Sequence, residues 1–560
     1  MSDDQPKSIN KKVEYEGLTY LINEEKKTAG VIGCKSGITK VIIPKKIKYK
    51  SKKYYVTSIL EEAFKDSEID SIKFALGSKI QTINKNAFIG TFIKSITIPS
   101  KLIELQNCWC YCTPKLNKIS VSPTNPYFKV YQNKFIIGKS SIEQKNYDQL
   151  IFCVRDVETV TIPDFIEHVC SCAFYRCENL IELKITENSK LQTIDDFAFT
   201  SISIQSLRIP SQIKRIGNGA FLYCKKIQHL EIPYESKLQI INELCFSNLS
   251  IKRITIPPQI THIGKFSFYE CYELQQVEIP RDSKLKIIDE SAFFCTSIES
   301  ILIPSNVEII GDGAFSLCNK LKHIEVPSDS KLHSIGSFAF ENVAIEKFEI
   351  PSKLVELKIG WCKDTKNLTK ISVSSLNPYF KVYKNKFIIG KSSIEKDFFD
   401  QLIFCVRNVK KVTIPNFIEH ICPYAFNSCR TERVEFTDDT KLQIIDDFAF
   451  SYSSIKCIRI PSKVTKIGEC TFETCRDLRK IEIPIDSKLQ LIGKFSFSCS
   501  SITSITIPSN VTKIAKSLFA SCEYLLIIEF YGNFKDRIIN QDAFNGTKNL
   551  LIMVGENQNH

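Results

Sequence analysis

The chain has 560 residues, of which 43% are hydrophobic and 24% are charged, and its 75 basic and 62 acidic residues give a formal net charge of +13. No stretch approaches the roughly 18 consecutive apolar residues of a membrane-spanning helix, and residues 1–12 lack the apolar core of a secretory signal. The residues alone therefore predict a soluble, cytoplasmic protein without a transmembrane segment. The lysines are dispersed through predicted loops, as is typical of a solvated surface, so we expect no nucleic-acid partner.

Three parts are expected in chain order. Residues 1–40 predict an amino-terminal cap with a hairpin, residues 41–554 predict one continuous repeat solenoid, and residues 555–560 form a short polar tail. A chain of this length usually folds into several domains, but a solenoid can be long because each coil contacts only its neighbours. We therefore expect one domain with two insertions, near residues 122–156 and 374–408.

Cysteines recur every 47 residues, and each follows a phenylalanine by three positions. Each unit divides into coils of 23 and 24 residues, and the apolar residue that closes each strand is usually followed by proline, which has no N–H to continue a strand ladder. The segment 321–326 predicts a short strand in which Ile324 and Val326 point inward. The first four cysteines of the series are Cys177, Cys224, Cys271 and Cys318, and it resumes at Cys429, Cys475 and Cys522.

Between strands, Ile310-Gly311 followed by Ala314-Phe315 predicts a tight helical turn that places one aromatic ring behind each strand. Stacked coils would bury every such ring between its counterparts, a gain of about 1.5–3 kcal/mol for each ring. The predicted fold class is therefore an α/β repeat solenoid with about 21 short parallel strands and short helical turns, plus two inserted β-hairpins.

The run Ile-Pro-Ser-x-Val-x-x-Ile-Gly-x-x-Ala-Phe-x-x-Cys-x-x-Leu-x-x-Ile-x-Val-Pro spans residues 303–327, and a near copy spans residues 460–484. It resembles the BspA-like leucine-rich repeats, and the resemblance covers nearly the whole chain. The resemblance implies a leucine-rich-repeat horseshoe or superhelix, and a surface antigen or adhesin that contacts host or matrix proteins without catalysis. The alternative is an intracellular scaffold or regulator of protein complexes. The residues favour the cytoplasm, whereas the resemblance favours the cell surface or secretion.

The two insertions are copies of each other, 252 residues apart. They read NPYFKVYQNKFIIGKSSIE from Asn125 and NPYFKVYKNKFIIGKSSIE from Asn377. Alternating apolar residues predict a hairpin that leaves the solenoid and returns. One interpretation makes the hairpins a bivalent contact whose exposed points are Lys129, Lys134, Lys381 and Lys386. The other is that the hairpins only cover the solenoid edge, because a duplication copies every segment it contains without selection for binding.

A second candidate surface is an acidic row on the outward face of alternate strands. Its carboxylates recur every 47 residues as Glu231, Glu278 and Glu325, and again as Glu435, Glu482 and Glu529. His229 and His323 lie next to this row. Concave solenoid faces are where partners usually dock, so the row is a candidate site for a protein ligand. The alternative is that these charges only pair across neighbouring strands.

Catalytic chemistry finds little support, because the histidines are periodic and no nucleophile recurs beside them; we expect neither an enzyme nor a cofactor. The cluster Cys108, Cys110 and Cys112, joined by Cys170 and Cys172, is a candidate for a metal site or a disulfide. Incidental buried thiols are the favoured interpretation of that cluster.

The carboxyl-terminal strand, residues 550–554, is followed by only six residues. Solenoids usually end in a polar capping unit, so we expect this edge to be covered by the tail or offered to another chain in self-association.

Overall fold

The computed structural model describes residues 11–141, 143–393, 395–532, 537–548 and 550–555. The first ten residues of the predicted cap and residues 556–560 of the predicted tail lie outside the described residues. The chain divides into two compact units, 1–274 and 275–560. Over the described residues it forms a β-solenoid of about 23 turns, close to the 21 strands that the sequence predicts.

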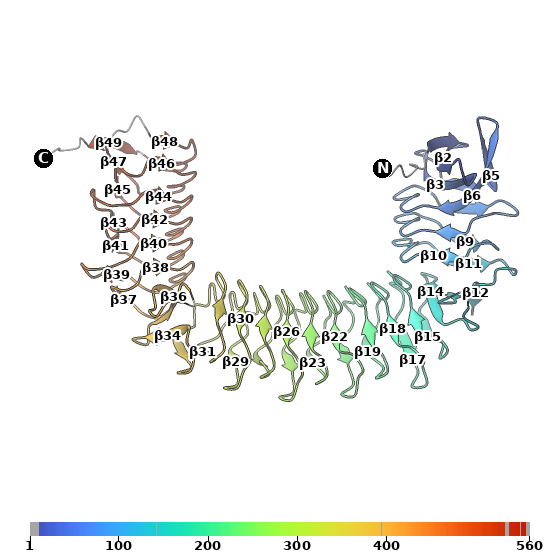
Figure 1. Cartoon of the computed structure of the whole chain (residues 1–560), viewed down its shortest axis with the longest axis horizontal. Coiled ribbons are helices and arrows are strands. Elements are labelled where there is room, and N and C mark those ends of the chain that lie inside the picture. The colour runs from blue at the N-terminus through green and yellow to red at the C-terminus, as the bar shows by residue number, and fades with distance from the viewer. Residues whose placement is uncertain (1–10, 142, 394, 533–536, 549, 556–560) are drawn as a thin grey trace, which may run out of the picture. The chain divides into compact units, whose positions relative to one another are not determined.

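Each coil contributes up to two short strands, and strands of successive coils lie side by side in two rows (Figure 1). The first row carries the strands that end near proline, and the second row carries two-residue strands, most of which precede glycine or a polar residue. In the first unit the first row contains β4 (Lys40–Ile43), β7 (Ser71–Phe74), β9 (Ser95–Ile98), β11 (Lys118–Val121), β15 (Thr159–Ile162), β17 (Glu182–Ile185), β19 (Ser206–Arg208), β21 (His229–Glu231) and β23 (Arg253–Thr255). Its second row contains β8 (Thr82–Ile83), β10 (Glu104–Leu105), β16 (His168–Val169), β18 (Thr193–Ile194), β20 (Arg215–Ile216), β22 (Ile240–Ile241) and β24 (His262–Ile263).

The second unit repeats this arrangement. Its first row contains β25 (Gln276–Glu278), β27 (Ser300–Leu302), β29 (His323–Glu325), β31 (Lys347–Ile350), β33 (Lys370–Val373), β37 (Lys411–Ile414), β39 (Arg433–Phe436), β41 (Cys457–Arg459), β43 (Lys480–Glu482), β45 (Ser504–Ile507), β47 (Ile527–Tyr531) and β49 (Leu551–Gly555). Its second row contains β26 (Ile287–Ile288), β28 (Ile309–Ile310), β30 (Ser334–Ile335), β32 (Glu356–Leu357), β38 (His420–Ile421), β40 (Ile444–Ile445), β42 (Lys466–Ile467), β44 (Leu491–Ile492), β46 (Lys513–Ile514) and β48 (Ile538–Ile539).

The predicted hairpin near the amino terminus is present. Strands β1 (Lys11–Tyr15), β2 (Leu18–Asn23) and β3 (Thr28–Cys34) pair antiparallel in chain order. Strand β3 then runs parallel to β6 (Lys52–Ile59), which also pairs antiparallel with β5 (Lys46–Tyr49). Because β6 also pairs in parallel with β8 of the second row, this sheet is joined directly to the first coils.

The first-row strands alternate as the sequence predicts. In β31, Phe348 and Ile350 are buried while Lys347 and Glu349 are exposed. In β29, Ile324 is half-buried between the exposed His323 and Glu325. One face of each strand therefore belongs to the core, and the other presents charged side chains to solvent.

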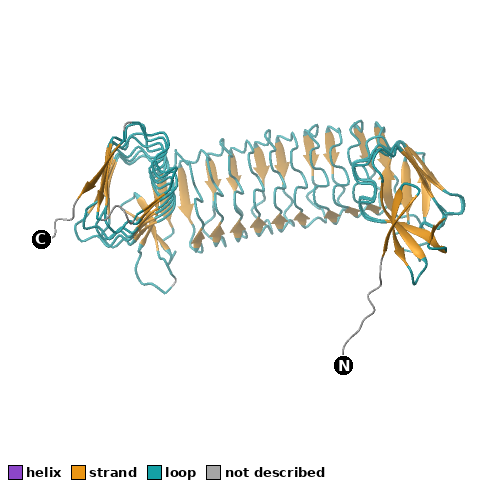
Figure 2. Cartoon of the chain, turned by 90° about the horizontal axis from the view of Figure 1, so that it is seen from above, coloured by secondary structure: helices purple, strands orange, loops and turns teal. Residues whose placement is uncertain are grey.

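The predicted helical turn is wrong, and so is the α component of the fold class: none of the described residues forms a helix (Figure 2). In the turn at 311–318, the N–H groups of Gly313, Phe315 and Leu317 donate to carbonyls of the next coil at 2.8–2.9 Å. Only alternate N–H groups, such as that of Ala314, bond within the turn. Gly313 and Leu317 have positive φ values of 61° and 62°, which turns alternate peptide groups toward the neighbouring coil.

The predicted aromatic row is confirmed within each unit. In the first unit Phe174, Phe199 and Phe221 stack with ring centroids 4.7 and 5.2 Å apart. In the second unit the series Phe426, Phe450, Phe472, Phe497, Phe519 and Phe544 stacks at 4.7–5.8 Å. The side chains of Phe174 to Phe519 in these series are fully buried, so the row forms the core of the solenoid.

Close packing between coils explains why glycine follows isoleucine in the repeat, as it does at Ile335-Gly336. A Cβ atom on Gly336 would lie 2.4 Å from the backbone nitrogen of Asp312 in the preceding coil. Real Cβ atoms do not approach backbone so closely, so a side chain here would push successive coils apart.

Each insertion forms the predicted hairpin, but the hairpin does not leave the solenoid. In the first copy β12 (Phe128–Tyr131) pairs antiparallel with β13 (Phe135–Gly138), and β13 pairs with β14 (Gln149–Cys153), which runs parallel to β16 of the second row. The second copy repeats this with β34 (Phe380–Tyr383), β35 (Phe387–Gly390) and β36 (Gln401–Cys405). Strands β13 and β35 are buried along their whole length, because they cover the edge of the second row.

The hairpins also interrupt both strand rows. Among the described residues no strand pairing joins β11 to β15 or β10 to β14, since β13 occupies the free edge of β14. The same interruption separates β33 from β37 and β32 from β36. We call these two places the first seam (residues 104–112 against 149–177) and the second seam (residues 356–364 against 401–429).

Candidate binding faces and the two seams

The six predicted carboxylates lie on the outward side of the first row. Glu231 is on β21 of the first unit, and the other five are on strands of the second unit. Four are exposed, whereas Glu435 and Glu529 are half-buried. His229 and His323, also predicted, are exposed at the opposite ends of the strands that carry Glu231 and Glu325.

Most of these carboxylates pair with nearby cations. Arg208 Nε lies 3.4 Å from Glu231, its partner in the β19–β21 register, and Arg281 Nη2 lies 2.7 Å from Glu325. Glu482 is 2.5 Å from Lys480 Nζ on the same strand. Pairing across neighbouring strands, which the alternative interpretation predicts, is therefore present at Glu231, whereas Glu325 pairs with a residue that follows β25 and Glu482 pairs within its own strand. Such exposed pairs contribute little to folding. A partner could exchange these contacts for its own at small cost.

Glu435 pairs with two cations. It lies 2.8 Å from Lys411 Nζ and 3.0 Å from Arg433 Nε. The hydrogen bond from Lys411 holds the pKa of the Glu435 carboxyl below its usual value. This carboxylate thus keeps its negative charge into mildly acidic solution.

Two of the four predicted hairpin lysines are exposed and two are not. Lys129 and Lys381 project from the outer strands β12 and β34. Lys134 and Lys386 are half-buried at the hairpin turns, and Lys134 Nζ donates to the carbonyl of Thr159 at 3.2 Å. The prediction that all four are exposed points is wrong for the last two, because each turn folds back onto the solenoid.

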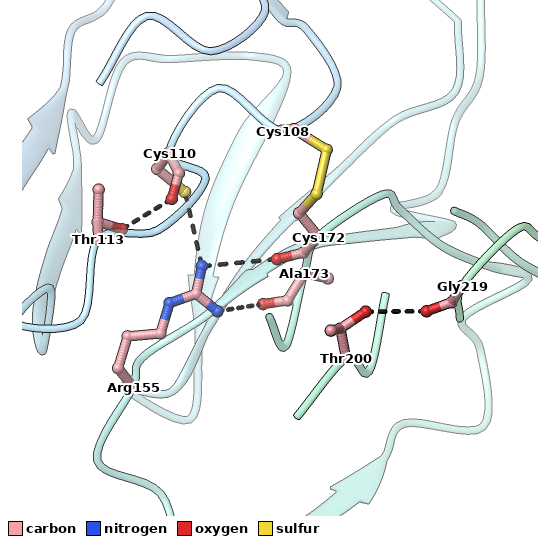
Figure 3. The surroundings of a disulfide bond; sticks show 8 residues. All are labelled: Cys108, Cys110, Thr113, Arg155, Cys172, Ala173, Thr200 and Gly219. Carbon is pink, nitrogen blue, oxygen red and sulfur yellow. Dashed lines mark hydrogen bonds between the residues drawn. A yellow bond between two sulfur atoms is a disulfide. The ribbon is translucent and has the colours of Figure 1, made fainter. Parts of the chain in front are cut away.

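The cysteine cluster forms a disulfide and not a set of incidental thiols. Cys108 is bonded to Cys172, whose Cα atom is 5.2 Å away across the first seam (Figure 3). No group of three or more metal-ligating side chains occurs within the described part of the chain. The other cluster members remain thiols, and burial raises the pKa of Cys110 to about 12.

A buried arginine bridges each seam, and sequence reasoning missed both. Arg155 is 4% exposed; it donates to the carbonyl of Ala173 at 3.0 Å and approaches Cys110 Sγ at 3.8 Å, as Figure 3 shows. Arg407 is 1% exposed; it donates to Cys429 Sγ at 3.2 Å on its own side of the second seam and to the carbonyl of Cys362 across the seam at 3.5 Å. The signal was the run Asp-Gln-Leu-Ile-Phe-Cys-Val-Arg, which follows both insertions.

The second seam contains a cavity in place of a disulfide. The cavity has a volume of about 270 Å³, and Gly360 and Tyr424 line it at the positions that match Cys108 and Cys172. His420 and Asp446 also line it, with Nε2 and Oδ2 3.0 Å apart. Cys422 is the thiol nearest to this pair in sequence, and burial raises its pKa well above the usual range, so it is protonated at neutral pH.

The described residues contain no helix long and apolar enough to cross a membrane. Strand β49 pairs in register with β47, and the self-association expected through its other edge stays a prediction.

The comparisons with solved structures return leucine-rich repeat proteins of low sequence identity. The crystal structure of the pneumococcal vaccine antigen PcpA is similar over 98% of this chain and 95% of that chain, with 15% identity and a TM-score of 0.47. A leucine-rich repeat protein from Bacteroides ovatus is similar over 97% and 99%, with 19% identity and a TM-score of 0.36. A leucine-rich cell surface protein from Faecalibacterium prausnitzii is similar over 100% and 97%, with 18% identity and a TM-score of 0.33. No curated protein matches the chain.

The family comparison covers most of the chain. The BspA type leucine rich repeat region matches in six copies, the last five of which overlap, at residues 34–135, 145–275, 239–369, 286–401, 392–526 and 443–558. These matches contain most of the strand, turn and aromatic positions described above; they span the second insertion and leave residues 136–144 of the first unmatched. The chain belongs to the BspA-type leucine-rich repeat family.

Proposed function

We propose that this protein is a noncatalytic binding protein of the cell surface that contacts host or matrix proteins through the outward face of its first strand row. Leucine-rich repeats generally bind proteins and are generally noncatalytic. The observation that carries the proposal is the exposed face of charged side chains on parallel strands, which offers many contacts at regular spacing.

The disulfide supports the surface location, because disulfides form and persist in oxidising compartments such as the cell exterior. An intracellular scaffold is the second candidate, and a separate observation favours it. Most cysteines of the described chain are free thiols, and one of them, Cys499, is exposed. Exposed free thiols are typical of proteins that stay in a reducing compartment.

Labelling of intact source cells with a membrane-impermeant amine reagent separates the two candidates. We expect this chain to be labelled while a cytosolic marker protein stays unlabelled, since lysines cover its loops. An unlabelled chain that is abundant in the same cells after lysis would overturn the surface proposal and favour the scaffold.

The binding face is tested by charge reversal against a panel of purified extracellular matrix proteins. We expect Glu325→Lys with Glu482→Lys to weaken binding at least tenfold, about 1.4 kcal/mol, in biolayer interferometry. The matched control is Lys129→Glu with Lys381→Glu on the two hairpins, which should bind like the unaltered protein.

If only the hairpin variant Lys129→Glu with Lys381→Glu loses binding, the partner contacts the two hairpins and not the first strand row. Equal affinity of all three proteins for every bound matrix protein would contradict a charged contact at either surface.

A further inference from the structure

The two seams are weak points of the solenoid, because within the described residues neither strand row pairs across them. At other junctions at least one strand row pairs, except between the coils of β43 and β45, where turn hydrogen bonds such as that from the Phe497 N–H to the Leu518 carbonyl (3.0 Å) join the coils. The contacts that remain across the first seam include the 3.8 Å contact of Arg155 with Cys110 Sγ, the ring contact of Tyr111 with Tyr175, and the Cys108–Cys172 disulfide. Local opening in a repeat protein starts where neighbouring coils share the fewest contacts, so each seam is a natural hinge.

The two cysteine positions of the first seam have nearly the same backbone φ as their counterparts in the second seam, although the side chains differ. Cys108 and Cys172 have φ values of 56° and 61°, and the matching Gly360 and Tyr424 have 61° and 62°. A neighbouring pair differs too, because Cys112 faces Arg176 in the first seam whereas Asp364 accepts a 2.6 Å hydrogen bond from Ser428 in the second. Duplication thus produced one backbone arrangement that is closed covalently in one copy and by polar contacts in the other.

We propose that the Cys108–Cys172 disulfide is a thiol–disulfide switch that holds the first seam closed when oxidised and lets it open when reduced. The second seam is the copy without the switch. The proposal does not depend on the binding partner, since it concerns the contacts between coils alone.

The chemistry needs a dithiol reductant. One of its thiolates attacks the sulfur of Cys108, which is half-exposed, and the S–S bond breaks with Cys172 leaving as a thiolate that takes up a proton. The second thiol of the reductant then attacks the mixed disulfide and releases Cys108. Two electrons and two protons pass to the protein, and the reductant ends as a disulfide. Cys172 is only 2% exposed, so attack from solvent is directed to Cys108.

Hydrogen exchange of the intact protein, with and without dithiothreitol, tests the switch. After reduction, confirmed by mass, we expect amides of residues 105–112 and 150–175 to exchange at least tenfold faster. The matching residues 357–364 and 402–427 should be unchanged, because no disulfide crosses the second seam. Unchanged exchange at the first seam after confirmed reduction would overturn the proposal, and so would an equal increase at both seams, which would indicate general loosening.

A transplant of the switch provides the matched variant. Phe338→Asn, Gly360→Cys and Tyr424→Cys give the second seam the residues that occupy positions 86, 108 and 172. Phe338 must change because a Cβ on Gly360 would lie 2.7 Å from its ring. We expect the new cysteines to form a disulfide and the exchange at the second seam to become sensitive to reductant. A disulfide that forms without this sensitivity would overturn the proposal; if the variant does not fold, the experiment on the unaltered protein still decides.

Discussion

Replacing Phe472 with alanine is expected to lower the free energy of unfolding by about 3–5 kcal/mol. The ring of Phe472 is fully buried and lies between Phe450 and Phe497, with centroids 5.3 and 5.6 Å away. Its removal loses the transfer free energy of the ring and leaves a cavity bounded by two rigid neighbours. The coils cannot close this gap, because their spacing is fixed by the strand rows on either side.

Urea titration followed by circular dichroism measures this loss, and hydrogen exchange of residues 450–519 locates it. Tyr524→Ala is the control, since that side chain is 62% exposed and its loss should be small. A change below 1 kcal/mol in the Phe472 variant would show that the ring is not part of the core stack.

The aromatic row was predictable because it depends only on the period of the sequence. One phenylalanine in each coil at a fixed offset can be buried only if the coils stack. The turn around that phenylalanine was not predictable in the same way, since Ile310, Ala314 and Phe315 also have the spacing of a helix. The deciding hydrogen bond, from Phe315 N–H to the carbonyl of Ala339, joins residues in different coils and leaves no local signal.

The disulfide and the buried arginines of the seams were also not predictable from local sequence. Cys108 and Cys172 are 64 residues apart in sequence, and only the path of the inserted hairpin shows that their coils become neighbours. Arg155 and Arg407 were missed for another reason: arginine is almost never fully buried without a partner, so a composition-based reading places it on the surface. Here backbone carbonyls and cysteine sulfurs accept its hydrogen bonds.

Cysteines of the 47-residue series form a ladder of buried thiols, which makes stability depend on pH. The thiols of Cys224, Cys271 and Cys475 donate to the carbonyls of Phe199, Phe246 and Phe450 at 3.0–3.2 Å. Burial raises the pKa of each of these three thiols to about 12, against a usual value of 9.0. Their ionisation in the folded protein would both bury a charge and remove the hydrogen-bond donor.

We expect two other thiols to act in the opposite direction. Burial opposes the ionisation of Cys429, but its hydrogen bond with Cys405 and the charge of Arg407 together lower its pKa. A lowered pKa contributes stability that is fully present above pH 9 and is lost as the pH falls through the folded value. The pKa of Cys177 is lowered in the same way, by its hydrogen bond with Cys153 and the charge of Arg155. The stability contributed by Cys177 and Cys429 therefore rises between neutral pH and pH 9. The destabilising effect of the ladder thiols begins above pH 9.

Above pH 9 the free energy of unfolding should fall steeply, because the ladder thiols ionise in the unfolded chain but keep their protons in the folded one. Each contributes a loss of roughly 1.4 kcal/mol per pH unit until its folded pKa is reached, so several together exceed the effect of any single substitution. Urea titrations at pH 7.5, 9.0 and 10.5 measure the loss. In Cys475→Ala, which removes one thiol from the ladder, the decline above pH 9 should be shallower by about one such contribution. Stability that stays level between pH 9.0 and 10.5 would mean that these thiols are not enclosed between the coils, and the placement of the whole cysteine series would be wrong.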